Sequence, residues 1–496
     1  MTTGASSIRL PITVAIGFTG HRSLPDEDKS RKLIYGFLKD KKETIPGMVY
    51  GVSSAAAGGD LIFAESCIQL EIPLRILLPM PQGQFRADFD AATWMQVQEV
   101  VKKAVSVEVT GGDQSRDERY YECGIETVHQ SRLLLALWNG EPARGLGGTE
   151  NILEFARQLG RPVVWIHSST GETRVFNENA AAALTRDPEL DFLNELPEPK
   201  EESEAKSPEA LASAWFKKVD ESATRFAPEV RQLASIPIIC TAAAAIVSGA
   251  GSWAPGVDAW IAVGAVLGIL AALLPPALKL QKRQVLWART RTAAEVCRSV
   301  LAFWYTPASY EVIGPDIVPE LSGMLMSLNL LKAIDPSRKS DSLEEFKERY
   351  RKERVSHQIA YFSRHARKSA RDARLYRIGI WTCVSFAILM SVYLFLGAAR
   401  VAGFGARTGD KWIALAVSIL FQLATIAGAL LVVNDSERRE RRYAELYELL
   451  TDWDAQLEAL RTWPSVLRVA GSIEKALLVE LLEWRSLTRN VKIPGE

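Results

Sequence analysis

Four long stretches without a charged side chain constrain the fold of this 496-residue chain most. They are bounded by Arg231 and Asp258, by Asp258 and Lys279, by Arg377 and Arg400, and by Lys411 and Asp435. Each holds about 20 or more residues, the length that a helix needs to cross a hydrocarbon core of roughly 30 Å. A buried helix of a soluble protein is the alternative for any single stretch. Together they predict an all-α membrane domain with four transmembrane helices in two hairpins, the last two at Ile378–Ala399 and Trp412–Asn434.

The overall composition excludes several classes of protein. The net charge is zero and the pI is about 7.0, so a general nucleic-acid role is not expected. The five cysteines are scattered without a CxxC pair, which is typical of a reducing compartment. The five histidines show no metal-ligand spacing with them, and no signal peptide precedes the first apolar run. We therefore expect no metal and an insertion that depends on the internal spans.

Basic residues predict the orientation of the spans. They cluster after the second span, before the third and after the fourth, at Lys279–Arg291, Arg364–Arg377 and Arg438–Arg442. The turn between the first two spans carries no basic residue, and the turn between the last two holds three. Because cytoplasmic loops are enriched in Lys and Arg, both turns are expected outside and both termini in the cytoplasm.

The two hairpins resemble each other. Each is preceded by a polar helix and followed by a basic one, in a pattern repeated at about 150 residues, as in membrane bundles built by duplication; chance similarity of amphipathic helices is the alternative. Within the spans there is no Asp, Glu, Lys, Arg or His, which argues against an ion-coupled transporter. A pore lined by hydroxyl or apolar groups and a simple anchor both remain open.

The first third of the chain predicts a Rossmann-like α/β domain. Short apolar runs alternate with helical segments, and glycines follow the runs, as in a doubly wound parallel sheet. Strands are expected at 11–16, 48–52, 75–78, 105–109, 132–138 and, as the last, 162–166. Helices are expected over 26–41 and from about Asp60 and Gly147.

Three glycine-rich loops should meet at the carboxyl edge of this sheet. There, glycine lets backbone N–H groups approach an anion and a helix N-terminus adds positive potential. We therefore predict binding of a nucleotide or ADP-ribose-type ligand, with Arg22 on a phosphate and Asp60 or Glu150 on ribose hydroxyls. Tight turns and helix starts are the alternative role of these loops. The candidate ligand-binding residues are Gly17, Thr19, Gly20, His21, Arg22, Ser54, Gly58, Gly59, Asp60, Gly147, Gly148, Thr149 and Glu150.

The expected domain organisation follows from these patterns. An acidic, Pro-rich segment after the α/β domain predicts a solvated linker. A helix over 208–233 is expected to carry movement of the α/β domain into the first span, or to be a rigid stalk. The predicted units are 1–175 (sensing domain), 176–207 (acidic linker), 208–305 (first helix–two-span–helix repeat), 306–345 (connector) and 346–496 (second repeat).

The first 170 or so residues resemble the SLOG superfamily, a Rossmann-like group related to the DNA-processing Smf proteins and to the LOG cytokinin-activating enzymes. The matching segments are Gly17–Arg22, Ser54–Asp60, Leu137–Gly140 and Gly147–Thr149. The second half resembles SLATT domains, two-span effector modules found beside SLOG domains. There the matching positions are Ala294, Glu295, Glu353, Arg354, Gln358, Tyr361, Ile473, Glu474, Glu480, Glu483 and Trp484.

These resemblances imply a bacterial antiviral role. A SLOG domain is thought to sense a nucleotide or NAD-derived messenger, after which a homo-oligomer, a tetramer being favoured, opens a pore or disrupts the inner membrane. LOG enzymes instead cleave nucleotides with a Pro-Gly-Gly-x-Gly-Thr-x-x-Glu motif. This chain lacks the Pro-Gly-Gly start and has Ile152 where that Glu would fall, so binding without turnover is favoured and no catalytic residue is assigned. A membrane-tethered nucleotide or NAD hydrolase and a passive scaffold remain the alternatives.

Overall fold

The computed structural model describes residues 7–112, 114–143, 145–200, 206–251, 262–270, 273, 280–307, 310–314, 317–398, 410–433 and 436–489. The chain divides into two compact units. The first, called the α/β unit, comprises Met1–Val219 and Glu295–Asp341. The second, called the helical unit, comprises Asp220–Ala294 and Ser342–Glu496. Each unit is therefore made of two segments that are separate in the sequence.

A seven-stranded sheet forms the centre of the α/β unit, in the order β4-β3-β2-β1-β5-β6-β7. All neighbouring pairs are parallel except β6 and β7. The strands are β1 (Ile12–Gly20), β2 (Gly47–Ser53), β3 (Leu74–Leu78), β4 (Ser106–Val109), β5 (Leu133–Trp138), β6 (Val163–His167) and β7 (Thr173–Phe176). This confirms the predicted parallel α/β domain. The chain builds outward from β1 to β4 and then crosses back to place β5 beside β1.

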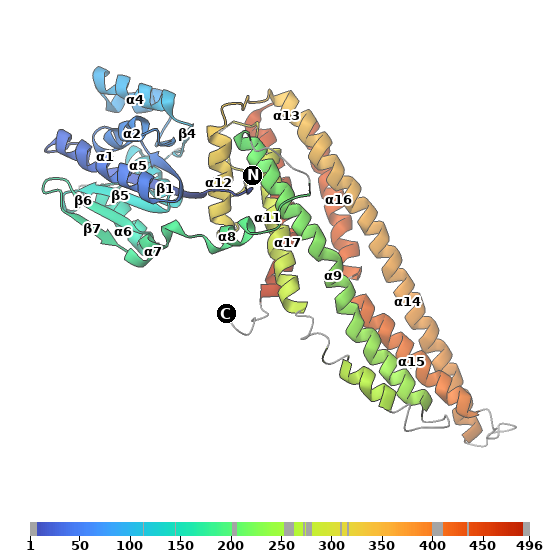
Figure 1. Ribbon diagram of the computed structural model, residues 1–496. Helices are drawn as coiled ribbons and strands as arrows, with labels where there is room; N and C mark the ends of the chain where they lie inside the picture. The colour runs from blue at the N-terminus through green and yellow to red at the C-terminus, as the bar shows by residue number, and fades with distance from the viewer. Residues whose placement is uncertain are drawn as a thin grey trace, which may run out of the picture. The chain divides into compact units, whose positions relative to one another are not determined.

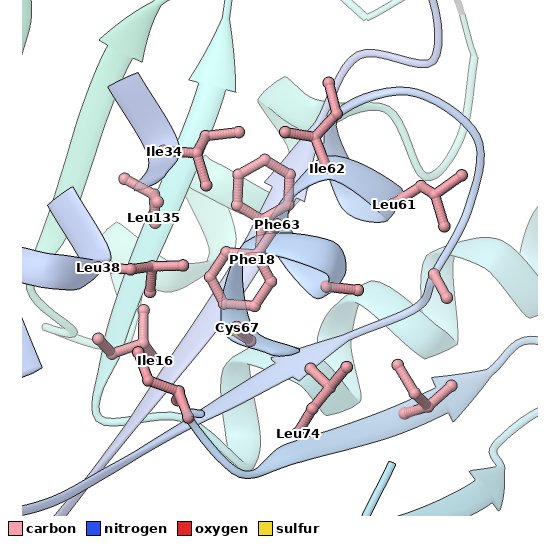
Figure 2. Close-up of a cluster of buried hydrophobic side chains, with 14 of the residues drawn as sticks. Ile16, Phe18, Ile34, Leu38, Leu61, Ile62, Phe63, Cys67, Leu74 and Leu135 are labelled. Atoms are coloured by element: carbon pink, nitrogen blue, oxygen red, sulfur yellow. The ribbon is translucent and has the colours of Figure 1, made fainter. Parts of the chain in front are cut away.

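Helices cover both faces of the sheet (Figure 1). One face is covered by α1 (Glu27–Thr44), α2 (Gly59–Gln69) and α4 (Ala91–Lys103), the other by α5 (Arg116–His129) and α6 (Thr149–Gln158). Figure 2 shows the core beneath α1 and α2, where Phe18 of β1 stacks on Phe63 of α2 with ring centroids 4.9 Å apart. Val14, Ile16 and Phe18 of β1 point into this core, and Ala15 points into the core on the opposite face. The apolar run of β1 is continuous because both faces of the strand are buried.

Two predictions about the sheet are wrong. The first strand is expected to end at residue 16, whereas β1 continues to Gly20. Gly17 pairs with Val52 and Leu134 inside the sheet. The last strand is not β6, because β7 follows it as an antiparallel edge. Its residues are mostly exposed, so β7 lacks the apolar run by which the other strands are recognised.

The predicted acidic linker is partly a packed element of the α/β unit. Residues 188–194 form α8 (Pro188–Asn194), whose Leu190 and Leu193 are buried. The side chain of Asn194 accepts a hydrogen bond from the backbone N–H of Leu10 and donates one to the carbonyl of Leu10, both at 2.9 Å. A solvated linker over 176–207 is therefore wrong for its α8 portion, because apolar and amide side chains there meet partners distant in sequence.

The first turns of α9 (Pro208–Gly251) are also anchored in the α/β unit. Trp215 is fully buried and donates a hydrogen bond from Nε1 to Asn194 Oδ1 at 2.9 Å. Lys218, 1% exposed, donates from Nζ to the carbonyls of Ile8 and Asn194 at 2.9 and 2.7 Å. From Asp220 onward the same continuous helix belongs to the helical unit.

The segment predicted as a connector, 306–345, returns to the sheet. Its helix α12 (Ser322–Ile334) packs on β1, and Leu330 is buried among Tyr50, Val52 and Leu77. The chain reaches α12 through α11 (Leu280–Ala302), whose residues from Glu295 on belong to the α/β unit. Asp220–Ala294 is thus an insertion with both ends fixed in one α/β unit.

The helical unit is built around α14 (Ser356–Ala398), which packs along α15 (Asp410–Val433) and α16 (Ser436–Ala459), as Figure 1 shows. The unit also includes α9 from Asp220 on, α11 up to Ala294, α13 (Leu343–Tyr350), α17 (Trp463–Arg489) and a short π-helical segment at Arg351–Val355. Arg354 in that segment pairs with Glu474 of α17 at 2.6 Å, where both side chains are almost fully buried. Tyr350 donates to the same carboxylate at 2.7 Å.

Two stretches among the described residues are long and apolar enough to cross a membrane, over Leu343–Leu396 and Trp412–Ala459. Their most apolar 18-residue windows have mean hydropathies of 2.0 and 2.3, and only 6% of each window is buried. The first stretch includes the predicted third span up to Leu396, and the second begins, like the predicted fourth span, at Trp412; Ala399 and Asn434, the predicted span ends, lie outside the described residues. Of the first two predicted spans, only 232–251, 262–270 and 273 lie among the described residues, and Ile238–Val247 is a shorter apolar helix.

Candidate functional site

The strand order places a candidate ligand site between β1 and β5. Here the loops after β1 and β5 diverge, because the chain builds outward from β1 in one direction and resumes on its other side. Such a switch point at the carboxyl ends of parallel strands is where open α/β sheets bind ligands. The loops are also joined, since the backbone N–H of His21 donates to the carbonyl of Leu137 at 3.3 Å.

A cavity of about 680 Å³ lies at this point, called here the rim cavity. Its volume falls within the range of about 300–1,000 Å³ that small-molecule sites usually have. Its walls come from the loops after β1, β2, β5 and β6 and from one side of α5. Ser168, after β6, lines it with a buried hydroxyl that has no hydrogen-bond partner.

Arg22 is held in the rim cavity by aromatic and acidic groups near α5. Its guanidinium lies over the ring of Tyr120, 4.3 Å from the centroid. The hydroxyl of Tyr120 donates to Asp88, which also pairs with Arg116. Burial and that hydrogen bond raise the pKa of Tyr120. The positive charge of Arg22 therefore lies against an aromatic ring, and no carboxylate of the described residues forms an ion pair with it.

Asp60 is the buried acid of the rim cavity. It is 7% exposed, and its Oδ1 accepts a hydrogen bond from Ser54 Oγ at 2.8 Å. Burial raises the pKa of Asp60 from 3.8 to about 6, although the Ser54 hydrogen bond and the charge of Arg22 oppose that shift. A carboxyl that titrates near neutrality in a cavity is a candidate for proton transfer or for pH-dependent ligand binding.

Two side chains hold the loop after β5. His21 Nε2 lies 2.9 Å from Asn139 Oδ1 and 3.1 Å from the Asn139 backbone nitrogen. Glu150 Oε2 accepts a hydrogen bond from the backbone N–H of Ala143 at 2.6 Å. Glu150 thus links this loop to the start of α6. A role at a helix start is the alternative to a ribose contact that the sequence left open.

Neither α2 nor α6 has a side-chain cap at its start, and α6 begins in the lining of the rim cavity. The N-cap residues of α2 and α6 are Gly58 and Gly148, and neither receives a side-chain hydrogen bond at that end. By contrast, α1, α4 and α5 are capped by Asp26, Asp90 and Ser115. The uncapped N-terminus of α6 directs backbone N–H groups and positive potential into the cavity, which suits an anion. At the start of α2 the N–H groups of Gly59 and Leu61 already donate to the carbonyls of His21 and Ala56.

The structure brings most of the predicted ligand-binding residues together. The residues that line the rim cavity are Thr19, Gly20, His21, Arg22, Ser54, Asp60, Gly147, Gly148, Thr149 and Glu150. Gly17, Gly58 and Gly59 are not in its lining. A Cβ on Gly17 would lie 2.7 Å from Ser131 Oγ, so this glycine serves the packing of the sheet against the end of α5.

Gly58 and Gly59 serve contact between two loops. Gly58 has a φ of +83°, and a Cβ there would lie 2.3 Å from the carbonyl oxygen of Arg22. The backbone N–H of Gly59 donates to the carbonyl of His21 at 3.0 Å. These glycines therefore let the loop after β2 close on the loop after β1, and they shape the cavity from behind.

Sequence reasoning did not find the contribution of α5. Asp117, Tyr120 and Cys123 line the rim cavity, and Tyr120 orients Arg22. They belong to α5, a helix that begins with a capping box and carries no ligand-binding sequence pattern. Their place in the cavity follows only from the fold, in which α5 crosses behind β1. Among the described residues, no cluster of His, Cys, Asp or Glu could hold a metal ion.

Comparison with known proteins adds no assignment. The chain matches no protein-family model and no curated protein.

Proposed function

We propose that this chain is a ligand-responsive membrane effector, in which a phosphate-bearing nucleotide or ADP-ribose-type molecule binds the rim cavity and shifts the arrangement of the membrane helices. The observation that carries the proposal is the rim cavity itself. It combines the uncapped N-terminus of α6, the stacked guanidinium of Arg22 and an unpartnered Ser168 hydroxyl in one cavity of about 680 Å³.

The chain path supports a mechanical connection. At its start, the insertion Asp220–Ala294 continues from α9, which Trp215 and Lys218 anchor in the α/β unit. At its end it continues into the part of α11 that belongs to the α/β unit and leads to α12. A ligand that favours one arrangement of the α/β unit would bias both ends at once. Ligand binding shifts an equilibrium only by its difference in affinity for the two states.

The wider features of the proposal come from the sequence. Four spans with both termini cytoplasmic, a homo-oligomeric assembly in a bacterial inner membrane, and a role in antiviral defence follow from the charge pattern and from the resemblance to SLOG and SLATT domains. The two exposed apolar stretches support the membrane part of this proposal.

The test is dye leakage from proteoliposomes that hold the full-length protein. Adding ADP-ribose, NAD or a cyclic nucleotide should raise the leakage rate, and Arg22→Ala should reduce that response. Arg157→Ala is the matched control, because Arg157 is exposed on α6, contacts Glu154 and the Phe176 ring, and does not line the rim cavity. Native mass spectrometry of the purified protein would count subunits and detect a copurified nucleotide. Leakage that ignores every probe would count against the proposal.

A second candidate function is a membrane-tethered nucleotide or NAD hydrolase, and one observation favours it. Asp60 lies in the rim cavity with a pKa of about 6, which suits a general acid or base near neutral pH. This candidate predicts that release of ribose 5-phosphate from AMP, or of nicotinamide from NAD, is lost in Asp60→Asn and retained in Arg157→Gln. Product formation that survives Asp60→Asn would remove Asp60 from such a reaction.

A further inference from the structure

A second cavity, of about 930 Å³, lies toward the amino ends of the strands, away from the rim, and is called here the α12 cavity. Residues at the amino ends of β3, β4, β5 and β6 form one wall, and α12 with the segment before it forms the other. The rim cavity is at the carboxyl ends of the strands, so the two cavities share no lining residue.

The α12 cavity is lined by charged side chains of both signs, with basic groups in slight excess. Its lining includes Arg75, Arg132, Arg161 and Lys332 against three carboxylates, Glu108, Glu126 and Glu311. Arg75 is paired with Glu311 at 2.6 Å. Lys332 is 2% exposed and donates to Thr306 Oγ1 at 3.0 Å and to the Tyr310 carbonyl at 2.9 Å.

Arg132 and Arg161 are different, because neither makes an ion pair within the described part of the chain. Nη1 of Arg132 is buried without a hydrogen-bond partner, and so is Nε of Arg75, whose side chain is itself well buried. Burial and the nearby charge of Arg132 lower the pKa of Arg161. Neither arginine pairs with Glu108 or Glu126, the described carboxylates of the lining that make no ion pair, so a bound anion would reduce the repulsion between the two guanidinium groups.

The backbones of both arginines are fixed. Arg132 donates its N–H to the Ala15 carbonyl at 2.9 Å, and Arg161 donates its N–H to the Ala156 carbonyl at 2.9 Å. Arg132 directly precedes β5, and Arg161 lies two residues before β6. The pair is therefore presented by the rigid sheet, an arrangement that costs little ordering on binding.

We propose that the α12 cavity is a second ligand site, which binds an anionic small molecule through Arg132 and Arg161. A phosphoryl or carboxylate group would accept paired hydrogen bonds from the guanidinium groups. Apolar lining from Leu325, Met326 and Leu330 of α12 would contact the rest of the molecule. The ligand would bridge the sheet to α12, the helix that follows the returning end of the insertion.

The experiment is calorimetric binding of pyrophosphate and of citrate to the full-length protein at matched ionic strength. It is made in an Arg22→Ala background, so that binding at the rim cavity does not contribute. Arg132→Gln and Arg161→Gln should each weaken the Kd about tenfold or more, since each removes a charged hydrogen-bond donor. Arg157→Gln, the same change on an exposed arginine, should leave the Kd unchanged. Binding of pyrophosphate alone identifies a phosphoryl ligand, and binding of citrate alone a carboxylate.

A second measurement separates binding from a structural role. Without an anion, Arg161→Gln should leave the melting temperature unchanged or raise it, because it removes a partly desolvated charge beside Arg132. A lower melting temperature without an anion would overturn the proposal. So would equal affinity in all variants, or no binding of either probe at millimolar concentration.

Discussion

At the scale of single residues, the rim cavity and the loops that shape it contain groups held in energetically costly states. Asp60 keeps a carboxyl where burial opposes its charge, and the nearby positive charge of Arg22 offsets only part of that cost. Gly58 keeps a backbone conformation that other residues rarely adopt. Both features can be removed by substitutions that change few atoms.

Asp60→Asn should change the pH dependence of stability. The pKa of Asp60 is raised from 3.8 to about 6, so between these values the folded protein binds more protons than the unfolded chain. The free energy of unfolding contributed by Asp60 therefore falls as pH rises through this window, by an amount on the order of 3 kcal/mol. Relative to the wild type, the variant should be more stable at pH 8 and gain little at pH 4. Thermal unfolding at several pH values measures this, and parallel profiles would contradict it.

Gly58→Ala should destabilise the loops that form the rim cavity. Its φ of +83° and the 2.3 Å approach to the Arg22 carbonyl oxygen leave no room for a methyl group without movement of the loop. A loss of about 1–3 kcal/mol is expected from the backbone strain alone. Gly36→Ala is the control, because Gly36 is in the middle of α1 with no atom near its Cβ position, and it should stabilise by about 0.5–1 kcal/mol. Denaturant unfolding compares the two variants.

At the scale of elements, each unit is held together by partners from distant segments. Asn194 of α8 joins the start of β1 to α9 in the α/β unit. In the helical unit, Arg354 joins the π-helical segment before α14 to Glu474 of α17. Such buried contacts fix the ends of the long helices, whose middle portions expose apolar side chains.

The Arg354–Glu474 pair should show strong energetic coupling. Arg354→Met leaves a carboxylate that is 0% exposed without that partner, and should cost about 3–5 kcal/mol. The double variant Arg354→Met/Glu474→Leu should recover a large part of this loss, because no buried charge is then left behind. Melting temperatures of the two single variants and the double variant form a double-mutant cycle. Additive losses would show that the pair is not coupled.

At the scale of the whole molecule, the prediction concerns topology. If the proposed orientation is correct, Gly251→Cys and Asp410→Cys, at the end of α9 and the start of α15, should react with an impermeant maleimide from outside the cell. Ser356→Cys and Ser436→Cys, at the starts of α14 and α16, should react only after the membrane is permeabilised. The five native cysteines are first replaced. The reverse pattern would place the α/β unit outside, where a cytosolic messenger could not reach it.

Much of the candidate site could be predicted from the chain alone, because its signals are local. Glycine after an apolar run marks a turn at a strand end, and this located the loops after β1, β2 and β5. The role of Tyr120 could not be predicted, because it depends on α5 crossing behind β1. The pairing of Asn194 with Leu10 spans 184 residues and carries no motif.

The amino-acid sequence by itself determined the parallel α/β domain, the glycine-rich loops and the apolar stretches, because strand propensity, turn chemistry and hydropathy act over a few residues. Only the tertiary structure decided that α8, the start of α9 and α12 belong to the α/β unit. It also decided that Arg132 and Arg161 face one cavity. These features depend on contacts between distant segments, and the free energy of such contacts depends on which surfaces the completed sheet leaves uncovered.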